Sequence, residues 1–231
     1  MTTTLTHTAT SEQTLTVTLP ATTLAAMMGA TDVARLTDAT RPQLCGWRIE
    51  VTGGELTITT TDSYRLATTS VTVDYTGDPI SVTTGELVGL GWPKWSTMMP
   101  PAVRKAIAGQ QATITVRGAI GHPASTVTID WAPGVAHTFT TEPDYPRYQS
   151  VIPTGRGADY AGNAPEAHMT AVNPRYLADL GAMVTRIDQV AGKDTSATVR
   201  LLACDPMRPT LWRLRHDAAT VDYVLMPVRV S

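Results

Sequence analysis

Cysteine is scarce in this sequence, which has only Cys45 and Cys204 among its 231 residues. Two isolated thiols form neither a disulfide framework nor a zinc site, and their scarcity is typical of a reducing compartment. Long hydrophobic runs are also missing, because no apolar stretch approaches the roughly 18 residues of a membrane helix. Residues 1–13 are polar and rich in threonine, which predicts a flexible N-terminal tail rather than a signal peptide. We therefore expect a cytoplasmic protein that makes no contact with membranes.

Charged residues are few as well. They make up 16% of the chain, against about 25% in an average globular protein, and the formal net charge is -2. A protein that holds DNA in a groove is usually strongly basic, because its affinity comes largely from neutralising phosphates. The charge therefore argues against tight, direct DNA binding. It is compatible with a protein that surrounds DNA loosely and gathers its basic side chains on one face.

Motifs for catalysis and for cofactors are missing from the sequence. No segment matches the phosphate-binding loop G-x-x-x-x-G-K-[ST] or the G-x-S-x-G elbow. The five histidines are scattered, whereas a metal site needs ligands at fixed spacings. Glu142 and Asp144 lie in a proline-bounded turn and have no visible partner for acid–base chemistry. We expect no catalytic residue, no cofactor and no metal ion, and hence no enzyme.

Threonine is abundant where charged residues are few, and it alternates with apolar residues. Thr57–Ile58–Thr59 and Thr113–Ile114–Thr115 are examples of this alternation. Threonine is β-branched and suits a pleated, half-buried surface, so the pattern predicts strands. Hydrophobic residues make up 42% of the chain, which is enough to form a substantial core.

The alternating segments recur in three units that share one order of elements: a strand, a helix, and then two or three more strands. In the first unit, Pro20 suits the first turn of a helix that carries Leu24, Met27 and Met28 on one face. Gly53-Gly54 predicts a hairpin turn. The expected strands of this unit cover 15–20, 47–51, 56–60 and 66–73.

The second unit begins with a strand at Ile80–Thr83. A helical stretch from about Glu86 to Ala108 follows, and Pro93 and Pro100-Pro101 divide it into two short helices. Its later strands are expected at 112–116, 126–131 and 136–140.

The third unit begins with a strand at Met169–Val172. Asn173-Pro174 forms a cap and a first helical turn, and Leu177, Leu180 and Val184 follow at helical spacing. Its later strands are expected at 198–202, 210–214 and 221–228.

This repeated order predicts an α+β protein with antiparallel sheets on one side and a few helices on the other. Residues 154–165 are rich in Gly, Ala and Pro and predict a loop. We expect a tail over 1–13, a domain over 14–144, a connector and loop over 145–165, and a smaller unit over 166–231.

Four segments resemble motifs of the β sliding clamp of bacterial DNA polymerase III. Residues 40–46 (TRPQLCG) are similar to that family's TRPILxG, and residues 61–67 (TDSYRLA) to its TDG[HY]RLA. Residues 145–153 (YPRYQSVIP) are similar to FPDYRRVIP, and residues 226–230 (MPVRV) to MPMRL. Residues 172–177 also resemble a helix start in the family's last domain. The segments stand in the family's order, and the resemblance extends from about Leu15 to Val230.

The resemblance implies a DNA-clamp fold, in which two strand–helix–strand–strand–strand units form a domain and six domains close a ring with helices inside. This chain is shorter than the family's. Residues 14–144 resemble the middle domain, and residues 166–231 resemble the second half of the last domain. Three units a chain imply a ring of four copies, or of three if the stretch over 154–165 contains a degenerate fourth unit. An open oligomer or a monomer is the alternative, and the short chain suggests a phage-encoded member.

In the family, these motifs converge on a groove that docks linear peptides of the polymerase, the clamp loader and repair proteins. The resemblance implies that Arg41 and Arg65 orient polar or acidic groups of the peptide, and that Ser63, where the family usually has Gly, changes the loop. Leu44 and Leu66 serve either the groove or simply the core. The implied groove residues are Arg41, Leu44, Thr61, Ser63, Tyr64, Arg65, Leu66, Pro146, Ser150, Val151, Met207, Pro209, Met226, Pro227, Val228 and Arg229.

Basic residues cluster in or near the expected helices, which would face duplex DNA in such a ring. A sliding ring needs weak contacts to phosphates that ignore the base sequence. Ordinary solvated helix faces are the alternative explanation for each of these residues. They are Lys94, Arg104, Lys105, Arg175, Arg186 and Lys193.

Three functions remain open from the sequence. The first is a homo-oligomeric sliding clamp, a processivity factor in DNA replication that encircles duplex DNA and binds a polymerase and a clamp loader. The second is a clamp-derived module that binds the same peptides without encircling DNA, and so regulates replication or transcription proteins. The third is an unrelated threonine-rich structural protein such as a virion component, which leaves the groove motifs unexplained.

Overall fold

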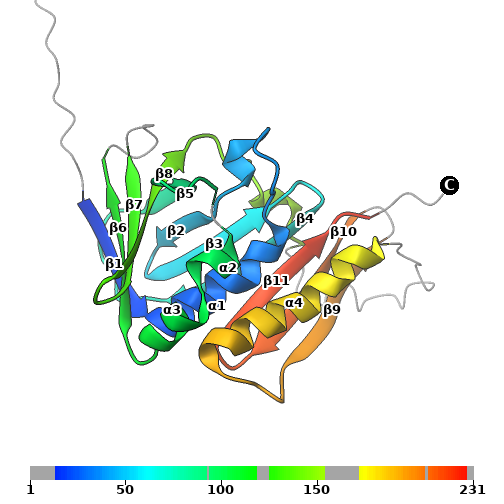
Figure 1. Cartoon of the computed structure of the whole chain (residues 1–231). Helices are drawn as coiled ribbons and strands as arrows, with labels where there is room; N and C mark the ends of the chain where they lie inside the picture. The colour runs from blue at the N-terminus through cyan, green and yellow to red at the C-terminus, as the bar shows by residue number, and fades with distance from the viewer. Residues whose placement is uncertain (1–13, 93, 119–124, 154–171, 206–207, 228–231) are drawn as a thin grey trace, which may run out of the picture.

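The computed structural model describes residues 14–92, 94–118, 125–153, 172–205 and 208–227. Within them the chain forms eleven strands and four α-helices, with three short 3-10 helices (Figure 1). The elements are β1 (Thr14–Pro20), α1 (Ala21–Thr31), η1 (Asp32–Ala34), η2 (Pro42–Leu44), β2 (Arg48–Thr52), β3 (Glu55–Thr61), β4 (Arg65–Thr72), β5 (Ile80–Leu87), α2 (Trp95–Met98), α3 (Pro101–Ala106), β6 (Gln111–Arg117), β7 (Thr126–Ala132), β8 (Val135–Glu142), η3 (Gln149–Val151), α4 (Pro174–Ala191), β9 (Thr198–Asp205), β10 (Arg208–His216) and β11 (Ala219–Leu225).

All eleven strands belong to one antiparallel sheet with the order β1-β6-β7-β8-β5-β2-β3-β4-β11-β10-β9. The four helices lie together on one face of this sheet, as Figure 1 shows. The expected α+β class, with repeated units and with sheet and helices on opposite sides, is therefore confirmed. We call β1–β4 with α1 unit 1, β5–β8 with α2 and α3 unit 2, and α4 with β9–β11 unit 3.

Units 1 and 2 exchange strands reciprocally. The first strand of unit 1, β1, pairs with β6 of unit 2, and Val17 lies opposite Ile114. The first strand of unit 2, β5, pairs with β2 of unit 1, and Val82 lies opposite Ile49. Each unit therefore covers the first strand after the helix of the other unit, and we call units 1 and 2 the closed pair, although β1 pairs only with β6 among the described residues.

Unit 3 joins this pair through an antiparallel contact between β4 and β11, from Thr69 opposite Val221 to Arg65 opposite Leu225. Residues 143–153 connect β8 of unit 2 to the undescribed stretch before α4, and we call them the connector. The outer strand of unit 3, β9, pairs only with β10 among the described residues.

Helix α1 forms the centre of the molecule. Its sequence, ATTLAAMMGAT, is hydrophobic nearly all round, as expected for a helix that is buried on all sides. Leu24, Met27 and Met28 pack into the core of units 1 and 2. Ala26 and Ala30 pack into the core of unit 3, where their small side chains let helix α4 approach. All residues of this helix are buried except Thr22 and Thr23, which are partly exposed.

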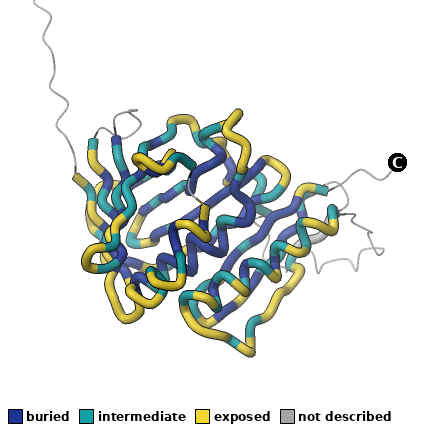
Figure 2. The backbone as a smooth tube through the Cα atoms, viewed as in Figure 1, coloured by how far each residue is buried: buried dark blue, intermediate teal, exposed yellow. Residues whose placement is uncertain are grey.

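Helix α4 is amphipathic by contrast. Leu180, Met183 and Ile187 are its buried side chains, and their spacing places them on one face. The side chain of Asn173 accepts a hydrogen bond of 3.0 Å from the N–H of Arg175, which caps the helix as the sequence predicted. The face of α4 away from these residues lies at the surface (Figure 2).

Two local predictions have definite outcomes. The Gly53-Gly54 turn is confirmed, because both glycines have positive φ and connect β2 to β3. The two short helices expected between Glu86 and Ala108 are confirmed as α2 and α3, but the expected start near Glu86 is wrong: β5 continues to Leu87, which pairs with Phe139 and is 4% exposed. Burial against β8 outweighs the local sequence preference here.

Several predictions lie outside the described residues, namely the tail over 1–13, the loop over 154–165 and the strand Met169–Val172. No helix among the described residues is both long and apolar enough to cross a membrane.

Candidate functional site

A small hollow opens where unit 1, the connector and unit 3 meet. Its cavity volume is about 170 Å³, slightly more than the roughly 150 Å³ apolar cavity that holds a benzene molecule. It therefore has room for one large apolar side chain. The residues that line it are Thr61, Ser63, Tyr64, Arg65, Leu66, Pro146, Arg147, Tyr148, Val151, Val224 and Met226.

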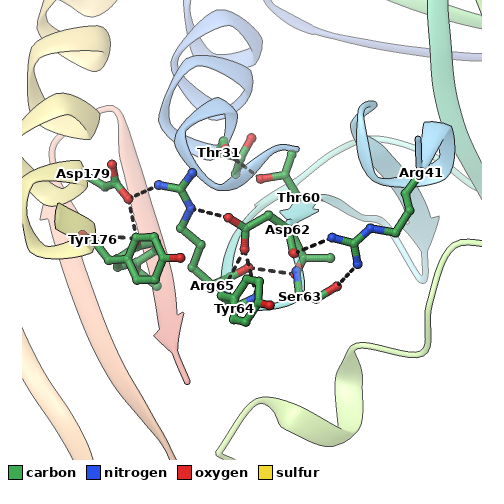
Figure 3. A network of polar contacts seen from close by, with 11 residues as sticks. Thr31, Arg41, Thr60, Asp62, Ser63, Tyr64, Arg65, Tyr176 and Asp179 are labelled. Atoms are coloured by element: carbon green, nitrogen blue, oxygen red, sulfur yellow. Dashed lines mark hydrogen bonds and ion pairs between the residues drawn. The ribbon is translucent and has the colours of Figure 1, made fainter. Parts of the chain in front are cut away.

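The tight turn between β3 and β4 forms one wall of the hollow (Figure 3). Asp62 organises this turn: its Oδ1 accepts hydrogen bonds from the N–H groups of Tyr64 and Arg65, at 2.9 and 3.0 Å. The hydroxyl of Thr61 donates to the carbonyl of Arg65 at 2.7 Å. A polar side chain that satisfies successive backbone groups fixes a turn, so the wall is preformed.

Ser63 at the tip of the turn has a φ of 81°, a backbone region that favours glycine. Its hydroxyl accepts a hydrogen bond of 3.0 Å from Nη1 of Arg41. Arg41 therefore braces the turn from outside, as Figure 3 shows, and does not line the hollow.

Arg65 connects this turn to unit 3. Its Nε donates to Oδ2 of Asp62 at 2.9 Å, its Nη1 pairs with Asp179 of α4, and its guanidinium lies 4.9 Å from the ring centroid of Tyr176 (Figure 3). Burial of Arg65 disfavours its charge, but the hydrogen bond and charge of Asp179 and then those of Asp62 outweigh burial and raise its pKa. The hydroxyl of Tyr223 also donates to Asp179, at 2.6 Å.

The connector forms the opposite wall. Tyr148 is 7% exposed, and its hydroxyl donates to the carboxylate of Glu50 on β2. Burial first, and then this hydrogen bond, raise the pKa of Tyr148 to about 12. Tyr145 packs edge-on against Tyr148 with ring centroids 6.0 Å apart, and burial raises its pKa as well. Two aromatic rings therefore hold the connector against the sheet.

The floor of the hollow is apolar. Leu66 of β4, Val224 of β11 and Tyr148 belong to one buried cluster, with Leu211 of β10. The rim is apolar too, because Tyr64 is 60% exposed and Met226 is 37% exposed. The N–H of Met226 donates to the carbonyl of Tyr64 at 2.9 Å, so the rim continues the pairing of β4 with β11.

The structure brings eight of the sequence-predicted groove residues to this hollow: Thr61, Ser63, Tyr64, Arg65, Leu66, Pro146, Val151 and Met226. Arg41, Leu44, Ser150, Pro209 and Pro227 are described but do not line it, and Leu44 is a core residue that is 3% exposed. Met207, Val228 and Arg229 lie outside the described residues.

Sequence reasoning missed Arg147, Tyr148 and Val224, which line the hollow as well. The connector motif contains the first two, so a complete reading of residues 145–153 would have included them. Val224 stands two residues before Met226 on the strand that pairs with β4, and only the pairing of β4 with β11 reveals it.

A second, larger hollow of about 750 Å³ lies on the helix face, between the segment of α2 and α3 and helix α4. Lys94, Arg104 and Arg186, all predicted to face DNA, line it together with Arg35. Arg186 pairs with Asp32 at 2.8 Å, and Arg35 pairs with the same carboxylate at 2.8 Å. Lys94 and Arg104 make no ion pair with any described residue, so their charges remain available on this face.

The other three predicted cations lie at the ends of helices. Lys105 is exposed at the end of α3, Arg175 is exposed in the first turn of α4, and Lys193 is exposed just after α4. The segments of α1, α2 and α3 contain no acidic residue. The helix face is therefore more basic than the net charge of -2 suggests.

Among the described residues, no three His, Cys, Asp or Glu side chains gather as metal ligands would. His216 and Asp188 form a pair at 3.0 Å, and Trp131 donates to Nδ1 of His137 at 2.8 Å. Both histidines therefore have a structural partner.

Comparison with known proteins supports the clamp resemblance. Residues 18–84 match the family model of the central domain of the DNA polymerase III beta subunit. The chain is similar in structure to the DNA polymerase sliding clamp of Bacillus subtilis, with 18% identity, a TM-score of 0.59, and coverage of 94% of this chain and 65% of that chain. The sliding clamp of Pseudomonas aeruginosa is similar at 18% identity and a TM-score of 0.59, over 94% of this chain and 67% of that chain.

The polymerase III beta protein of Caulobacter crescentus is similar at 20% identity and a TM-score of 0.60, over 96% of this chain and 68% of that chain. No curated protein sequence matches the chain. The clamp fold and the resemblance to bacterial beta clamps are thus confirmed. The chain spans 65% of the length of the Bacillus clamp, and the central-domain match lies within unit 1 and the start of unit 2.

Proposed function

We propose that this chain is a subunit of a DNA sliding clamp, a non-catalytic processivity factor that docks linear peptides of replication proteins in the hollow between units 1 and 3. The apolar hollow at that junction carries the proposal. Leu66 and Val224 form its floor, and Tyr64 and Met226 leave its rim uncovered. A pocket of this shape suits the apolar anchor of a short peptide.

The composition of the rim suits several partners. Met226 has a flexible thioether side chain that repacks around different anchors. Tyr64 offers a large surface at a low cost in conformational entropy. A processivity factor that must bind a polymerase and a clamp loader in turn needs such tolerance.

Arg147 recognises acidic groups of the peptide in this proposal. Arg65 is less suited to that role, because Asp62 and Asp179 already neutralise it. Arg147 is exposed, lines the hollow, and forms no ion pair with a described residue. In place of the peptide recognition that the resemblance implies, we give Arg65 a positioning role: it holds the turn of unit 1 against unit 3.

Duplex DNA lies along the helix face in this proposal, opposite the outer face of the sheet. Lys94 and Arg104 lie in the helix-face hollow and form no ion pair with a described residue, and Lys105, Arg175 and Lys193 are exposed at the ends of α3 and α4. Flexible lysine and arginine side chains give weak contacts to phosphates that depend on salt and ignore sequence. Residues 14–144 and 166–231 would supply one and a half clamp domains, so four copies would complete a ring.

The proposal is tested by fluorescence anisotropy with a labelled short peptide that carries one leucine and one phenylalanine anchor, and with the same peptide after both anchors are changed to alanine. We expect saturable binding of the first peptide only. The double variant Y64A/M226A should weaken binding at least about tenfold, because both rim contacts are lost. The matched control V88A/L90A removes two exposed side chains away from the hollow and should bind like the wild type. Equal binding of both peptides would contradict the proposal.

A second candidate is a peptide-binding module of clamp origin that does not encircle DNA. The net charge of -2 and the length, at 65% of the Bacillus clamp, favour this candidate. Photo-crosslinking of duplex DNA to the helix face separates the two, because only the clamp holds DNA there.

A further inference from the structure

The two edge strands of the sheet, β1 and β9, differ in how far their apolar side chains are exposed to solvent. Strand β1 buries its apolar side chains, with Val17 at 2% and Leu19 at 4% exposed, and turns Thr14, Thr16 and Thr18 outward. Strand β9, at the other end, leaves Val199 at 40% and Leu201 at 45% exposed. Figure 2 shows the exposed stretch of β9 along the edge of unit 3.

The two exposed residues of β9 point to the helix side of the sheet. Val199 lies opposite Leu214, which is fully buried in the core beneath α4, and Leu201 lies opposite Trp212 on the same face. Residues that face each other across an antiparallel pair share one side of the sheet. Helix α4 therefore covers β10 and β11 but leaves the apolar side of β9 uncovered.

Natural proteins usually protect an edge strand with proline, with inward charges or by keeping it short. Strand β9 has eight residues and contains no proline. Its described side chains on the helix side, Val199 and Leu201, are both apolar. An unprotected edge of this kind is typical of a surface that another strand covers.

Units 1 and 2 show what covers such an edge in this molecule. Strand β2 of unit 1 is the counterpart of β9, since each is the first strand after the main helix of its unit, and β5 of unit 2 covers it. Strand β6 of unit 2 is another counterpart, and β1 of unit 1 covers it. Both counterparts therefore have a neighbouring unit on their outer edge, while β9 has none among the described residues.

We propose that the third unit of a second copy of this chain covers the β9 edge. A two-fold axis then relates the two copies, so that the edge strand β9 of each copy faces the edge strand β9 of the other. Self-complementary pairing needs no other protein. The inference deepens the proposed clamp function, because it names the contact through which copies meet.

The test uses the full chain and two matched double variants. V199K/L201K places two charges on the β9 edge, and V88K/L90K makes the same changes at two side chains that are 59% and 71% exposed outside unit 3. We expect light scattering to give a multiple of the monomer mass for the wild type and for V88K/L90K. V199K/L201K should raise the dissociation constant of that association at least about thirtyfold, because charged groups on an edge oppose pairing.

Hydrogen exchange tests whether the copies associate through the β9 edge. Thr198–Leu202 should become more protected as protein concentration rises, in the wild type and in V88K/L90K but not in V199K/L201K. A monomeric wild type, a V199K/L201K variant that keeps the wild-type mass, or equal dissociation of both variants would each overturn the inference. Concentration-dependent protection of Thr14–Pro20 would also overturn it, because it would indicate a head-to-tail contact with β1. Peptide binding by a monomer would leave the proposed function standing, so the two failures are distinguishable.

Discussion

The closed pair of units 1 and 2 and the single unit 3 each place a helix before a run of three antiparallel strands, but they reach stability differently. Units 1 and 2 exchange strands and share one core, with Trp47, Trp131 and Phe139 at its centre. Unit 3 has a smaller core, part of which comes from unit 1 through Ala26 and Ala30 of α1. A half-domain of this fold therefore depends on a neighbour for burial, and here that neighbour is unit 1.

The candidate hollow lies at the contact between unit 1 and unit 3. Its floor includes Leu66 from unit 1 and Val224 from unit 3, so the hollow exists only while the two units stay together. Arg65 and Asp179 join them next to the hollow. Changes to this junction should therefore affect unit 3 and peptide binding, whereas changes to the shared core should affect the whole chain.

The largest effect is expected for Trp47→Ala. Trp47 is fully buried, and its indole N–H donates to the carbonyl of Met28 at 3.0 Å. Its removal should lower the free energy of unfolding by about 4 kcal/mol, as is typical of a buried aromatic residue changed to alanine. Urea denaturation followed by circular dichroism measures this loss. The control Trp212→Ala, at a half-buried residue of unit 3, should cost less than half as much, and equal losses would contradict the comparison.

Arg65→Met should destabilise unit 3 and leave the closed pair of units 1 and 2 nearly unchanged. It leaves the carboxylates of Asp62 and Asp179 without their cation in a mostly buried site, which costs about 3 kcal/mol. Hydrogen exchange should become faster in α4 and β11, with little change in β6 and β7. The control Arg213→Met breaks the pair with Asp222 on the more exposed side of unit 3 and should cost less than about 1 kcal/mol. Uniform loss of protection across the chain would contradict the prediction.

Alkaline pH should loosen the junction before the closed pair. The pKa of Tyr148 is raised from 10.0 to about 12, so this group's contribution to stability is fully present below pH 10 and is lost as pH rises toward 12. The expected loss from this group at pH 11 is about 1 kcal/mol after allowance for solvent. Urea denaturation at pH 8 and pH 11 measures it. Tyr148→Phe removes this titration, and an unchanged pH dependence in that variant would contradict the assignment.

The smallest effect is expected for Ser63→Gly. Glycine relieves the positive φ of 81° at this position but loses the hydrogen bond from Arg41. The two effects nearly cancel, and we expect a gain in stability below about 1 kcal/mol. Thermal unfolding measures the gain, and peptide affinity should change less than about threefold if Ser63 only shapes the turn. A loss of stability above 1 kcal/mol would show that the contact with Arg41 is the stronger effect.

Local signals made most of the fold predictable. Alternating threonines identified the strands, and Asn173-Pro174 located the start of α4. The extension of β5 to Leu87 was not predictable, because it depends on pairing with Phe139 more than fifty residues away in sequence. Local preference indicates an element, but tertiary burial decides where that element ends.

The candidate site was predictable where its residues come from one motif. Thr61, Tyr64 and Leu66 come from one turn and its strand, and the structure brings them to the hollow together. The ion pair between Arg65 and Asp179 was not predictable, because Asp179 lies 114 residues away and no sequence pattern joins the two residues. Long-range partners of a charge decide its role, and those partners depend on the docking of α4.

The most direct test of the account is photo-crosslinking of the chain to duplex DNA at low ionic strength. Thr185→p-benzoylphenylalanine places the probe on α4 in the helix-face hollow, and Ser70→p-benzoylphenylalanine places it on the exposed outer face of β4. We predict a crosslink from position 185 that weakens with added salt, because the contact is to phosphates, and none from position 70. A crosslink from position 70 alone, or from neither position at a concentration where the chain binds peptide, would contradict a clamp that holds DNA on its helix face.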